Sequence, residues 1–256
     1  MELKNSVFAV TGGSSGLGEA TVIHVVKNGG KAVILDLNEE KGAELVGKLG
    51  QEHVHFVKTN VASEQDVQDA LNQAVDKFFA IHAVVNCAGI GTAQKVLKKG
   101  KPQNLEDFNK VIQVNLVGTF NVIRLAAEKM LKNEPNEHGE RGVIISTASV
   151  AAFEGQIGQA AYSASKGGIV SMTMPIAREF ARDGIRVMTI APGLFETPLF
   201  QTLSKEARVA LGEMVPFPSR LGVPSEYAQL VESIVTNPML NGETIRLDGA
   251  IRMQPK

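Results

Sequence analysis

The chain has 256 residues, of which 44% are hydrophobic and 21% are charged, and its formal net charge is −1. This composition is ordinary for a soluble globular protein with one large α/β domain or two small ones, and it excludes a global electrostatic field that would recruit nucleic acid or an acidic membrane. The single cysteine, Cys87, excludes an intramolecular disulfide and a multi-cysteine zinc site, and it favours a reducing compartment.

Short runs of apolar and β-branched residues alternate with longer amphipathic runs along the whole chain. Seven runs predict strands, which in chain order are Val7–Thr11, Ala32–Asp36, Val54–Lys58, Ala83–Asn86, Gly142–Thr147, Ile185–Ala191 and Glu243–Leu247. Several are nearly all apolar, as expected for parallel strands that are covered on both faces. We therefore expect right-handed βαβ units and one Rossmann-like α/β domain over residues 1–256, with a doubly wound parallel sheet of about seven strands flanked by helices.

The first strand pattern starts at Val7 and leaves no room for a targeting segment. No apolar run approaches the ~18 residues that span a bilayer. We therefore expect a cytoplasmic protein that has neither a membrane nor a nucleic acid as partner.

Two segments fit neither a helix nor a strand. Gly91–Asn104 is rich in lysine, and Pro192–Ser204 follows the sixth predicted strand. Long loops at the carboxyl ends of strands are where such folds bind their ligands. We therefore expect an insertion loop at 91–104 and a substrate lid at 192–215.

A glycine-rich stretch, TGGSSGLG at Thr11–Gly18, joins the first strand to the first helix. Its spacing lets backbone N–H groups approach a pyrophosphate at the N-terminus of a helix. The alternative is a glycine-rich turn that binds no ligand. The residues of this loop that we expect to contact a cofactor are Gly12, Ser14, Ser15, Gly16, Leu17 and Gly18.

Asp36 ends the second predicted strand, 18 residues after Gly18. A carboxylate at this spacing can accept hydrogen bonds from both hydroxyls of an adenosine ribose, and it repels a 2′-phosphate. Neither the residues that follow Asp36 nor the serines of the glycine loop are basic, so no cation is at hand for that phosphate. The pattern predicts that the cofactor is NAD rather than NADP. The alternative is that Asp36 is a solvated turn residue without a role in binding.

Further motifs show that the chain resembles the short-chain dehydrogenase/reductase family over essentially its whole length. Besides TGGSSGLG they are NCAG at Asn86–Gly89, Asn115 in VNLVG, Ser149 in STASV, Tyr162-x-x-x-Lys166, and APG at Ala191–Gly193. Within the family, the chain resembles a branch whose members are known both as 3-hydroxyacyl-CoA dehydrogenases and as 17β-hydroxysteroid dehydrogenases. The stretches that carry this resemblance are the lysine-rich insertion, NVIRLAAEKM, GVIISTASVAAFEGQIGQAAYSASKGGIV and NGETIRLDGAIRMQP. Two departures from the family pattern are Asn60, where aspartate is common, and Cys87, which we interpret as a buried small residue.

Tyr162 and Lys166 are four residues apart, so they share one face of a helix. A free tyrosine has a pKa near ~10, and a nearby cation favours the phenolate. We therefore expect Lys166 to lower the pKa of Tyr162, so that the phenol can accept the proton of a substrate hydroxyl while hydride leaves for the cofactor. The alternative is an ordinary surface pair of an aromatic residue and a solvated amine.

The family resemblance implies the remaining roles. Lys166 binds the nicotinamide ribose, Ser149 binds the substrate oxygen, and Asn115 holds a water that links Lys166 to solvent. Thr197 binds the nicotinamide carboxamide. Other expected cofactor contacts are Leu37, Asn60, Val61, Cys87, Ala88, Gly89, Pro192, Gly193, Leu194 and Phe195, together with Asp36, Tyr162 and Lys166. Other expected substrate contacts are Gln156, Leu199 and Phe200, and Leu194, Phe195, Leu199 and Phe200 form an apolar lid that excludes water.

We expect an NAD-dependent oxidoreductase that interconverts a secondary alcohol and a ketone, with short or 2-methyl-branched 3-hydroxyacyl-CoA as the first candidate substrate. One alternative is a hydroxysteroid or other secondary-alcohol dehydrogenase. Another is a 3-oxoacyl-carrier-protein reductase, which Asp36 disfavours because such enzymes usually prefer NADPH. A non-catalytic NAD-binding scaffold is disfavoured because Asn115, Ser149, Tyr162 and Lys166 are all present.

Three further expectations concern partners. The resemblance implies a homotetramer built on long helices near Leu105–Leu131 and Gln159–Arg182. No metal site is expected, because His53 and His55 share a strand face without a third ligand. The insertion lysines either form a solvated charged loop or attract the phosphates of CoA; they are Lys95, Lys98, Lys99 and Lys101.

Overall fold

The computed structural model describes residues 1–198 and 204–255. Seven strands form one sheet, namely β1 (Val7–Thr11), β2 (Lys31–Asp36), β3 (Val54–Lys58), β4 (Ala83–Asn86), β7 (Gly142–Thr147), β8 (Ile185–Pro192) and β9 (Thr244–Leu247). Their order across the sheet is β3-β2-β1-β4-β7-β8-β9, and every neighbouring pair is parallel. The single Rossmann-like domain is thus confirmed, and each predicted strand is found with its ends within one residue.

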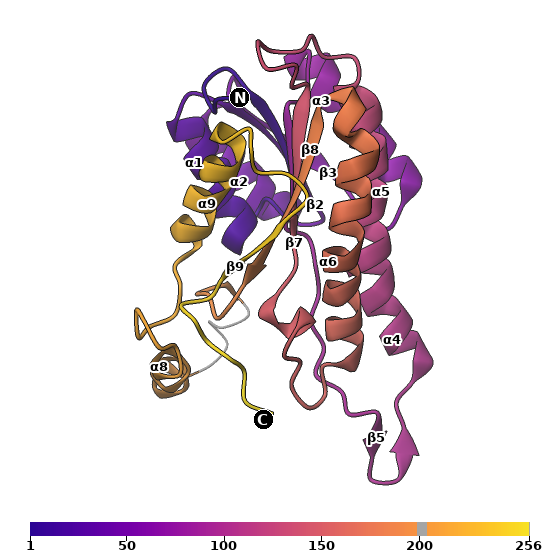
Figure 1. Ribbon diagram of the computed structural model, residues 1–256, viewed down its shortest axis with the longest axis vertical. Coiled ribbons are helices and arrows are strands. Elements are labelled where there is room, and N and C mark those ends of the chain that lie inside the picture. The colour runs from indigo at the N-terminus through magenta and orange to yellow at the C-terminus, as the bar shows by residue number, and fades with distance from the viewer. Residues whose placement is uncertain (199–203, 256) are drawn as a thin grey trace.

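Helices cover both faces of the sheet (Figure 1). One face is covered by α1 (Gly16–Lys27), α2 (Glu39–Leu49) and α9 (Pro224–Thr236), and the other by α3 (Glu64–Phe78), α5 (Gly118–Met130) and α6 (Ala160–Phe180). Each face has its own apolar cluster, with Phe8 and Ile34 in the first and Leu71 and Ile123 in the second. Every residue of β1, β4, β7 and β8 is buried, which explains why these strands read as continuous apolar runs.

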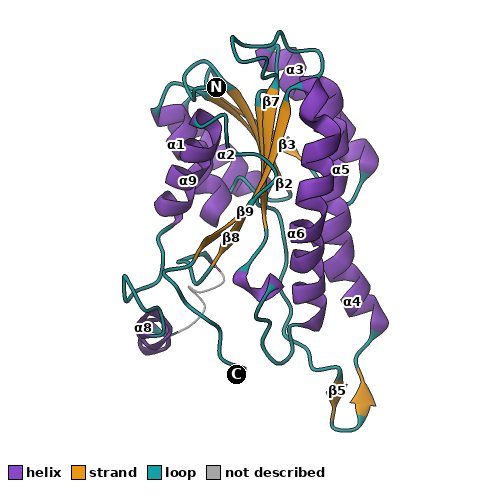
Figure 2. Ribbon diagram, in the orientation of Figure 1, coloured by secondary structure: helices purple, strands orange, loops and turns teal. Residues whose placement is uncertain are grey.

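A long helical rod runs beside α6 (Figure 2). It consists of α4 (Leu105–Ile112), a π-helical turn at Gln113–Val117, and α5, so the predicted long helix near Leu105–Leu131 is present with one irregular turn. That turn contains the fully buried Asn115. A π-turn inserts an extra residue into a helix and is frequent at functional sites.

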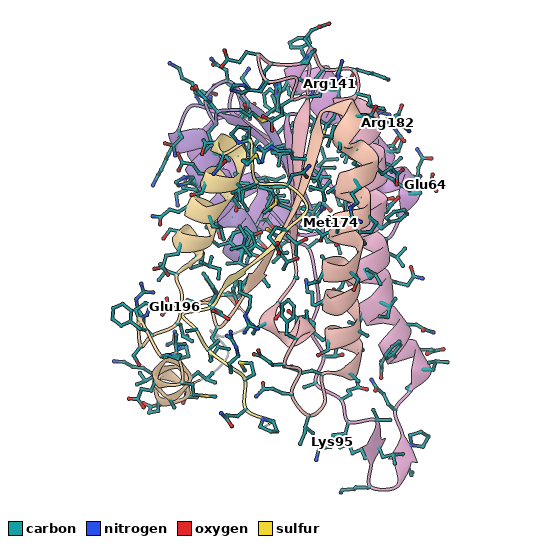
Figure 3. The ribbon with its side chains drawn as sticks, viewed as in Figure 1. Glu64, Lys95, Arg141, Met174, Arg182 and Glu196 are labelled. Carbon is teal, nitrogen blue, oxygen red and sulfur yellow. The ribbon has the colours of Figure 1, made fainter. Side chains whose placement is uncertain are left out.

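The carboxyl ends of the strands lie at one end of the molecule. Arg141, which immediately precedes β7, lies at the opposite end from Lys95 and Glu196 (Figure 3). The insertion at 91–104, expected to be irregular, contains a small antiparallel hairpin of β5 (Leu97–Lys98) and β6 (Lys101–Pro102). Helix α8 (Lys205–Glu213) lies at the same end (Figure 1). In the described part of the chain, no helix is long and apolar enough to cross a membrane.

The strand order also locates a crevice. The chain builds β1, β2 and β3 toward one edge and then returns to place β4 on the other side of β1. Ligands of doubly wound sheets bind in the crevice outside the carboxyl ends of the strands where the strand order reverses, which here is between β1 and β4.

Candidate active site

The loop between β1 and α1 carries the predicted phosphate-binding glycines. Gly12 has φ +63°, and a Cβ atom on it would lie 2.9 Å from the backbone nitrogen of Ala88. A Cβ atom on Gly18 would overlap the carbonyl oxygen of Gly12. Ser15 occupies the N-cap of α1 without a side-chain capping bond, so first-turn N–H groups remain available to an anion.

Asp36 lies beside this loop at the carboxyl end of β2. Its Oδ2 atom accepts a hydrogen bond from the backbone N–H of Ser14 at 3.1 Å, and its Oδ1 atom accepts one from that of Asn38 at 3.0 Å. These bonds fix the carboxylate and leave lone pairs on both oxygens for ribose hydroxyls. Leu37, the next residue, is exposed.

A hollow of about 290 Å³ adjoins the start of α1. It is lined by Ser15, Gly16, Glu19, Ala20, Ile23, Lys41, Glu196, Pro198 and Pro224. Lys41 of α2 lines this hollow, so a cation lies near the loop, contrary to the expectation from the residues beside Asp36 and in the glycine loop. Glu19 and Glu196 line it too, so carboxylates outnumber ammonium groups among the described lining residues, which disfavours the additional 2′-phosphate of NADP.

Asn60 and Val61 follow β3, on the side expected to hold adenine. The Oδ1 atom of Asn60 accepts a hydrogen bond from the N–H of Ala62 at 3.1 Å. Val61 is buried, and its carbonyl accepts a hydrogen bond from Nδ2 of Asn121 at 3.0 Å. The exposed amide of Asn60 therefore keeps its NH2 group and one lone pair for a ligand.

The segment after β4 lies against the glycine loop. The N–H of Cys87 donates to the carbonyl of Thr11 at 3.1 Å, and the N–H of Ala88 donates to Oγ1 of Thr11 at 3.1 Å. The Cys87 thiol packs against Thr147 and Tyr227, and burial raises its pKa. We expected a buried small residue; Cys87 as a whole is only partly buried, but its thiol packs among neighbouring side chains as that interpretation requires.

Asn115 holds two parts of the site together from the π-turn. Its Oδ1 atom accepts from the N–H of Ile90 at 2.8 Å, and its Nδ2 atom donates to the carbonyl of Ile90 at 2.8 Å. The same Nδ2 atom donates to Oγ of Ser165 on α6 at 3.0 Å. Because both amide hydrogens are used within the protein, the side chain positions the β4 loop against α6, and the expected water relay remains a prediction.

Ser149, Tyr162 and Lys166 meet at the carboxyl end of β7. Ser149 follows the strand, its Oγ accepts a hydrogen bond from the N–H of Ala151 at 3.1 Å, and its side chain lies near enough to the phenol to lower the pKa of Tyr162. Lys166 lies one turn after Tyr162 on α6, with its Nζ 5.7 Å from the centre of the tyrosine ring. The Lys166 side chain is buried, and its Nζ donates to the carbonyl oxygen of Thr147 at 2.7 Å.

The expected effect of Lys166 on Tyr162 is not what this geometry gives. Burial raises the pKa of Tyr162 above its ordinary value, and the nearby side chain of Ser149 offsets only part of that rise. Burial also lowers the pKa of Lys166 to about 8. The ammonium faces the ring and Thr147, so loss of water around the phenol outweighs the attraction of the nearby cation.

The segment after β8 is called the cofactor loop, Gly193–Pro198. The expected lid residue Phe195 is instead 5% exposed, packs in the first-face core and contacts Gly222, so it anchors this loop. Leu194 is partly buried. Thr197 lies close to Gly16 and so lies beside the phosphate loop, while its expected bond to the nicotinamide carboxamide remains a prediction. Leu199 and Phe200 lie outside the described residues.

The segment between Ser149 and α6 is called the substrate loop, Phe153–Gly158. Phe153 and Ile157 are each about half exposed, which sequence reasoning did not single out. Gln156, an expected substrate contact, donates from Nε2 to the carbonyl of Gln254 at 3.0 Å. The loop is therefore tied to the C-terminal tail while presenting two apolar side chains.

These residues suit a dinucleotide. The uncapped start of α1 offers N–H donors for a pyrophosphate, the carboxylate of Asp36 offers acceptors for a ribose, and the ammonium of Lys166 lies where β7 and α6 meet. A Cβ atom on Gly89 would lie 3.6 Å from Nζ of Lys166 and 3.2 Å from Oδ1 of Asn115, so a small residue there leaves the ammonium approachable.

Comparisons with known proteins agree with this arrangement. A family model described as short chain dehydrogenase matches residues 6–208. The human protein 3-hydroxyacyl-CoA dehydrogenase type-2 is 60% identical over 255 residues, which cover 99% of this chain and 97% of that protein. The protein of the same name from Drosophila melanogaster is 55% identical over 255 residues, which cover 99% of this chain and 100% of that protein. A crystal structure of 3-hydroxyacyl-CoA dehydrogenase type-2 from Mycobacterium avium has a TM-score of 0.94, with 43% identity and 98% of both chains covered.

The buried ammonium leads to a prediction about stability. The pKa of Lys166 falls from 10.5 to about 8 on folding, so the charge destabilises the protein below pH 8, and this penalty fades as the pH rises toward 10.5. The shift corresponds to roughly 3 kcal/mol, less about 1 kcal/mol for the hydrogen bond to Thr147. We expect Lys166→Met to raise the free energy of unfolding at pH 7 by roughly 1–2 kcal/mol and to abolish turnover.

Urea unfolding at pH 7 and at pH 10 measures this effect. The advantage of the variant should shrink at the higher pH, and the exposed Lys77→Met should change little at either. A Lys166→Met variant that is less stable than the wild type at pH 7 would contradict the account.

Proposed function

The chain belongs to the short-chain dehydrogenase family and is an oxidoreductase that uses a nicotinamide cofactor, and on this premise we propose that it interconverts 3-hydroxyacyl-CoA and 3-oxoacyl-CoA with NAD. Near-full-length similarity to 3-hydroxyacyl-CoA dehydrogenase type-2 proteins supports the substrate. The meeting of Ser149, Tyr162 and Lys166 beside the crevice is the observation that carries the chemistry.

The chain's own residues move one proton. For oxidation of the alcohol, Tyr162 must first lose its own proton to solvent; its phenolate oxygen then accepts the O–H proton of the substrate while the C–H hydrogen leaves as hydride and a carbonyl forms. A nicotinamide cofactor, when bound, would supply the hydride chemistry in either direction. Ser149 binds the reacting oxygen and lowers the cost of its developing negative charge. The raised pKa keeps Tyr162 protonated at neutral pH, ready to donate a proton to a 3-oxo group.

Asp36 supports NAD as the cofactor. Two backbone bonds hold its carboxylate at the end of β2, where a 2′-phosphate would meet its negative charge. Among the described residues that line the adjoining hollow, Lys41 is the one cation, and Glu19 and Glu196 offset it. The same argument disfavours a 3-oxoacyl-carrier-protein reductase that depends on NADPH.

The half-exposed Phe153 and Ile157 favour an apolar ligand on the substrate side. This observation suits an acyl chain and equally a steroid, so a hydroxysteroid dehydrogenase remains the second candidate. The two differ in the CoA group, whose phosphates only an acyl-CoA would bring to the insertion lysines.

We also propose a homotetramer in a reducing, cytoplasmic compartment. Several large apolar side chains are exposed along the α4–α5 rod and on α6, namely Leu105, Val117, Phe120, Leu131 and Met174. Pairing of such faces between copies would cover this apolar surface. The compartment rests on the single cysteine.

The proposed substrate is tested by a panel of reactions. kcat/KM is measured with acetoacetyl-CoA, a 2-methyl-3-hydroxyacyl-CoA and a steroid, each with the NAD and the NADP form of the cofactor. We expect acyl-CoA substrates to exceed the steroid, and the NAD form to exceed the NADP form. A steroid that is preferred, or equal rates with both cofactors, would overturn the corresponding part of the proposal.

Tyr162→Phe tests the role of the phenol. The variant keeps the ring and the packing but has no proton to exchange, so kcat should fall at least ~100-fold, within the range of general acid–base catalysis. Cofactor affinity, followed by nucleotide fluorescence, serves as the control and should change little. A residual kcat above a tenth of the wild-type value would be incompatible with Tyr162 as the proton carrier.

The four exposed insertion lysines give a test of the CoA group. Neutralising Lys95, Lys98, Lys99 and Lys101 together should raise the KM for acyl-CoA and leave that for a small uncharged alcohol unchanged. A matched control neutralises four exposed lysines at or just after helix C-termini, Lys27, Lys48, Lys77 and Lys132. Equal changes in KM for both substrates would contradict a contact with CoA and would mean that these lysines belong to a solvated charged loop.

A further inference from the structure

A network of four charged residues joins the substrate loop to the end of β9. We call it the Glu154 network, and it consists of Glu154, Arg246, Asp248 and Arg252. Its centre is a two-point contact in which Nη1 of Arg246 lies 2.8 Å from Oε1 of Glu154 and Nη2 lies 3.1 Å from Oε2. Paired N–H donors of this kind fix the orientation of a carboxylate as well as its position.

Arg246 also reaches the residues around this contact. Its Nε donates to Oδ2 of Asp248 at 2.7 Å, and its Nη2 donates to the carbonyl of Ile251 at 3.0 Å. Its guanidinium lies 5.2 Å from the ring centre of Phe153 in the substrate loop. The Glu154 and Arg246 side chains are only 25% and 22% exposed, so solvent screens their contact less than it screens a surface pair.

On the substrate side, the network fixes the backbone that leads to the catalytic tyrosine. Oε2 of Glu154 accepts a hydrogen bond from the N–H of Met253 at 3.3 Å. The C-terminal tail then continues along the loop, where the N–H of Ile157 donates to the carbonyl of Pro255 at 3.0 Å. The contact of Gln156 with Gln254 belongs to the same strip of tail. The C-terminal tail thus holds the substrate loop, which lies between Ser149 and Tyr162 in the sequence.

On the cofactor side, the network touches the loop after β8. A Cβ atom on Gly193 would lie 2.9 Å from both Cα and Cβ of Asp248, and the N–H of Gly193 donates to the carbonyl of Leu247 at 2.9 Å. Asp248 therefore packs directly on the first residue of the cofactor loop. One arginine thus connects the loop beside Tyr162 with the loop beside the phosphate-binding glycines.

We propose that Glu154 and Arg246 are positioning residues that hold the substrate loop at a fixed place relative to the cofactor loop, so that a bound substrate lies correctly between Ser149 and Tyr162. The proposal rests on the proposed function for its kinetic part only. Neither residue takes part in proton or hydride transfer. They set where the apolar side chains of the substrate loop meet the ligand, and a small misplacement of reacting groups costs a large factor in rate.

The test uses Glu154→Gln, Arg246→Met and the double variant in the full chain. Each single variant should raise the KM for the acyl-CoA substrate about tenfold while the affinity for NADH stays within about twofold. The KM of the double variant should not exceed that of the more impaired single variant, because both changes break the same contact. Glu226→Gln is the matched control, since Glu226 forms an equally close two-point contact with Arg220 at the start of α9.

Amide hydrogen exchange provides a readout that needs no substrate. The variants should exchange faster at residues 155–158 than the wild type and equally slowly in β7 and β8. If the wild type proves inactive on acyl-CoA, the proposed function fails while this exchange result still supports the network. A lower melting temperature with unchanged KM and unchanged loop exchange would show a merely structural ion pair and overturn the inference.

Discussion

The site depends on one buried charge. Lys166 places its ammonium in a region from which water is excluded, and the hydrogen bond of that ammonium goes to the carbonyl oxygen of Thr147. An isolated charge in such surroundings is unfavourable, as the lowered pKa of Lys166 shows. The protein tolerates it because β7 and α6, which hold the two groups, belong to a large apolar core that outweighs the local cost.

The parallel sheet brings the other groups to that charge. Thr11, Asp36, Asn86 and Thr147 lie at the carboxyl ends of four different strands, and parallel pairing places all four ends at one edge. The loops that follow then interlock through main-chain contacts, such as the N–H of Ala88 on Thr11. Residues far apart in sequence therefore form one site.

Sequence alone gave the strands to within one residue because buried parallel strands are short apolar runs bounded by turn residues. Local motifs also pointed to Asp36 and the tyrosine–lysine pair, which the structure places at the end of β2 and on one face of α6, while their roles stay predictions. The direction of the Tyr162 pKa shift could not be predicted from the sequence, since the burial that causes it arises from loops that pack around the phenol. Phe195 was misjudged for a similar reason, because the space that buries it is provided by Gly222 on a later segment.

Partners on the main chain are also invisible in the sequence. Asn115 binds the backbone of Ile90, and Lys166 binds the backbone of Thr147. Every residue type carries such backbone groups, so the identity of the partner residue does not predict either contact. Lys41 lines the hollow beside Ser15 although it is distant from the glycine loop in sequence. Such contacts depend on how helices pack, which periodicity constrains only loosely.

Burial acts on both members of the pair and decides how they cooperate. With its pKa near 8, Lys166 is largely charged at neutral pH, while the raised pKa keeps Tyr162 neutral. The ammonium therefore faces an uncharged phenol, and their attraction is weak before the reaction. If Tyr162 gives its proton to a carbonyl, as proposed, a negative charge develops on a ring whose centre lies 5.7 Å from the Lys166 ammonium in a poorly screened site. In that mechanism Lys166 would stabilise the transition state more than the resting state, which is the condition under which binding energy accelerates a reaction.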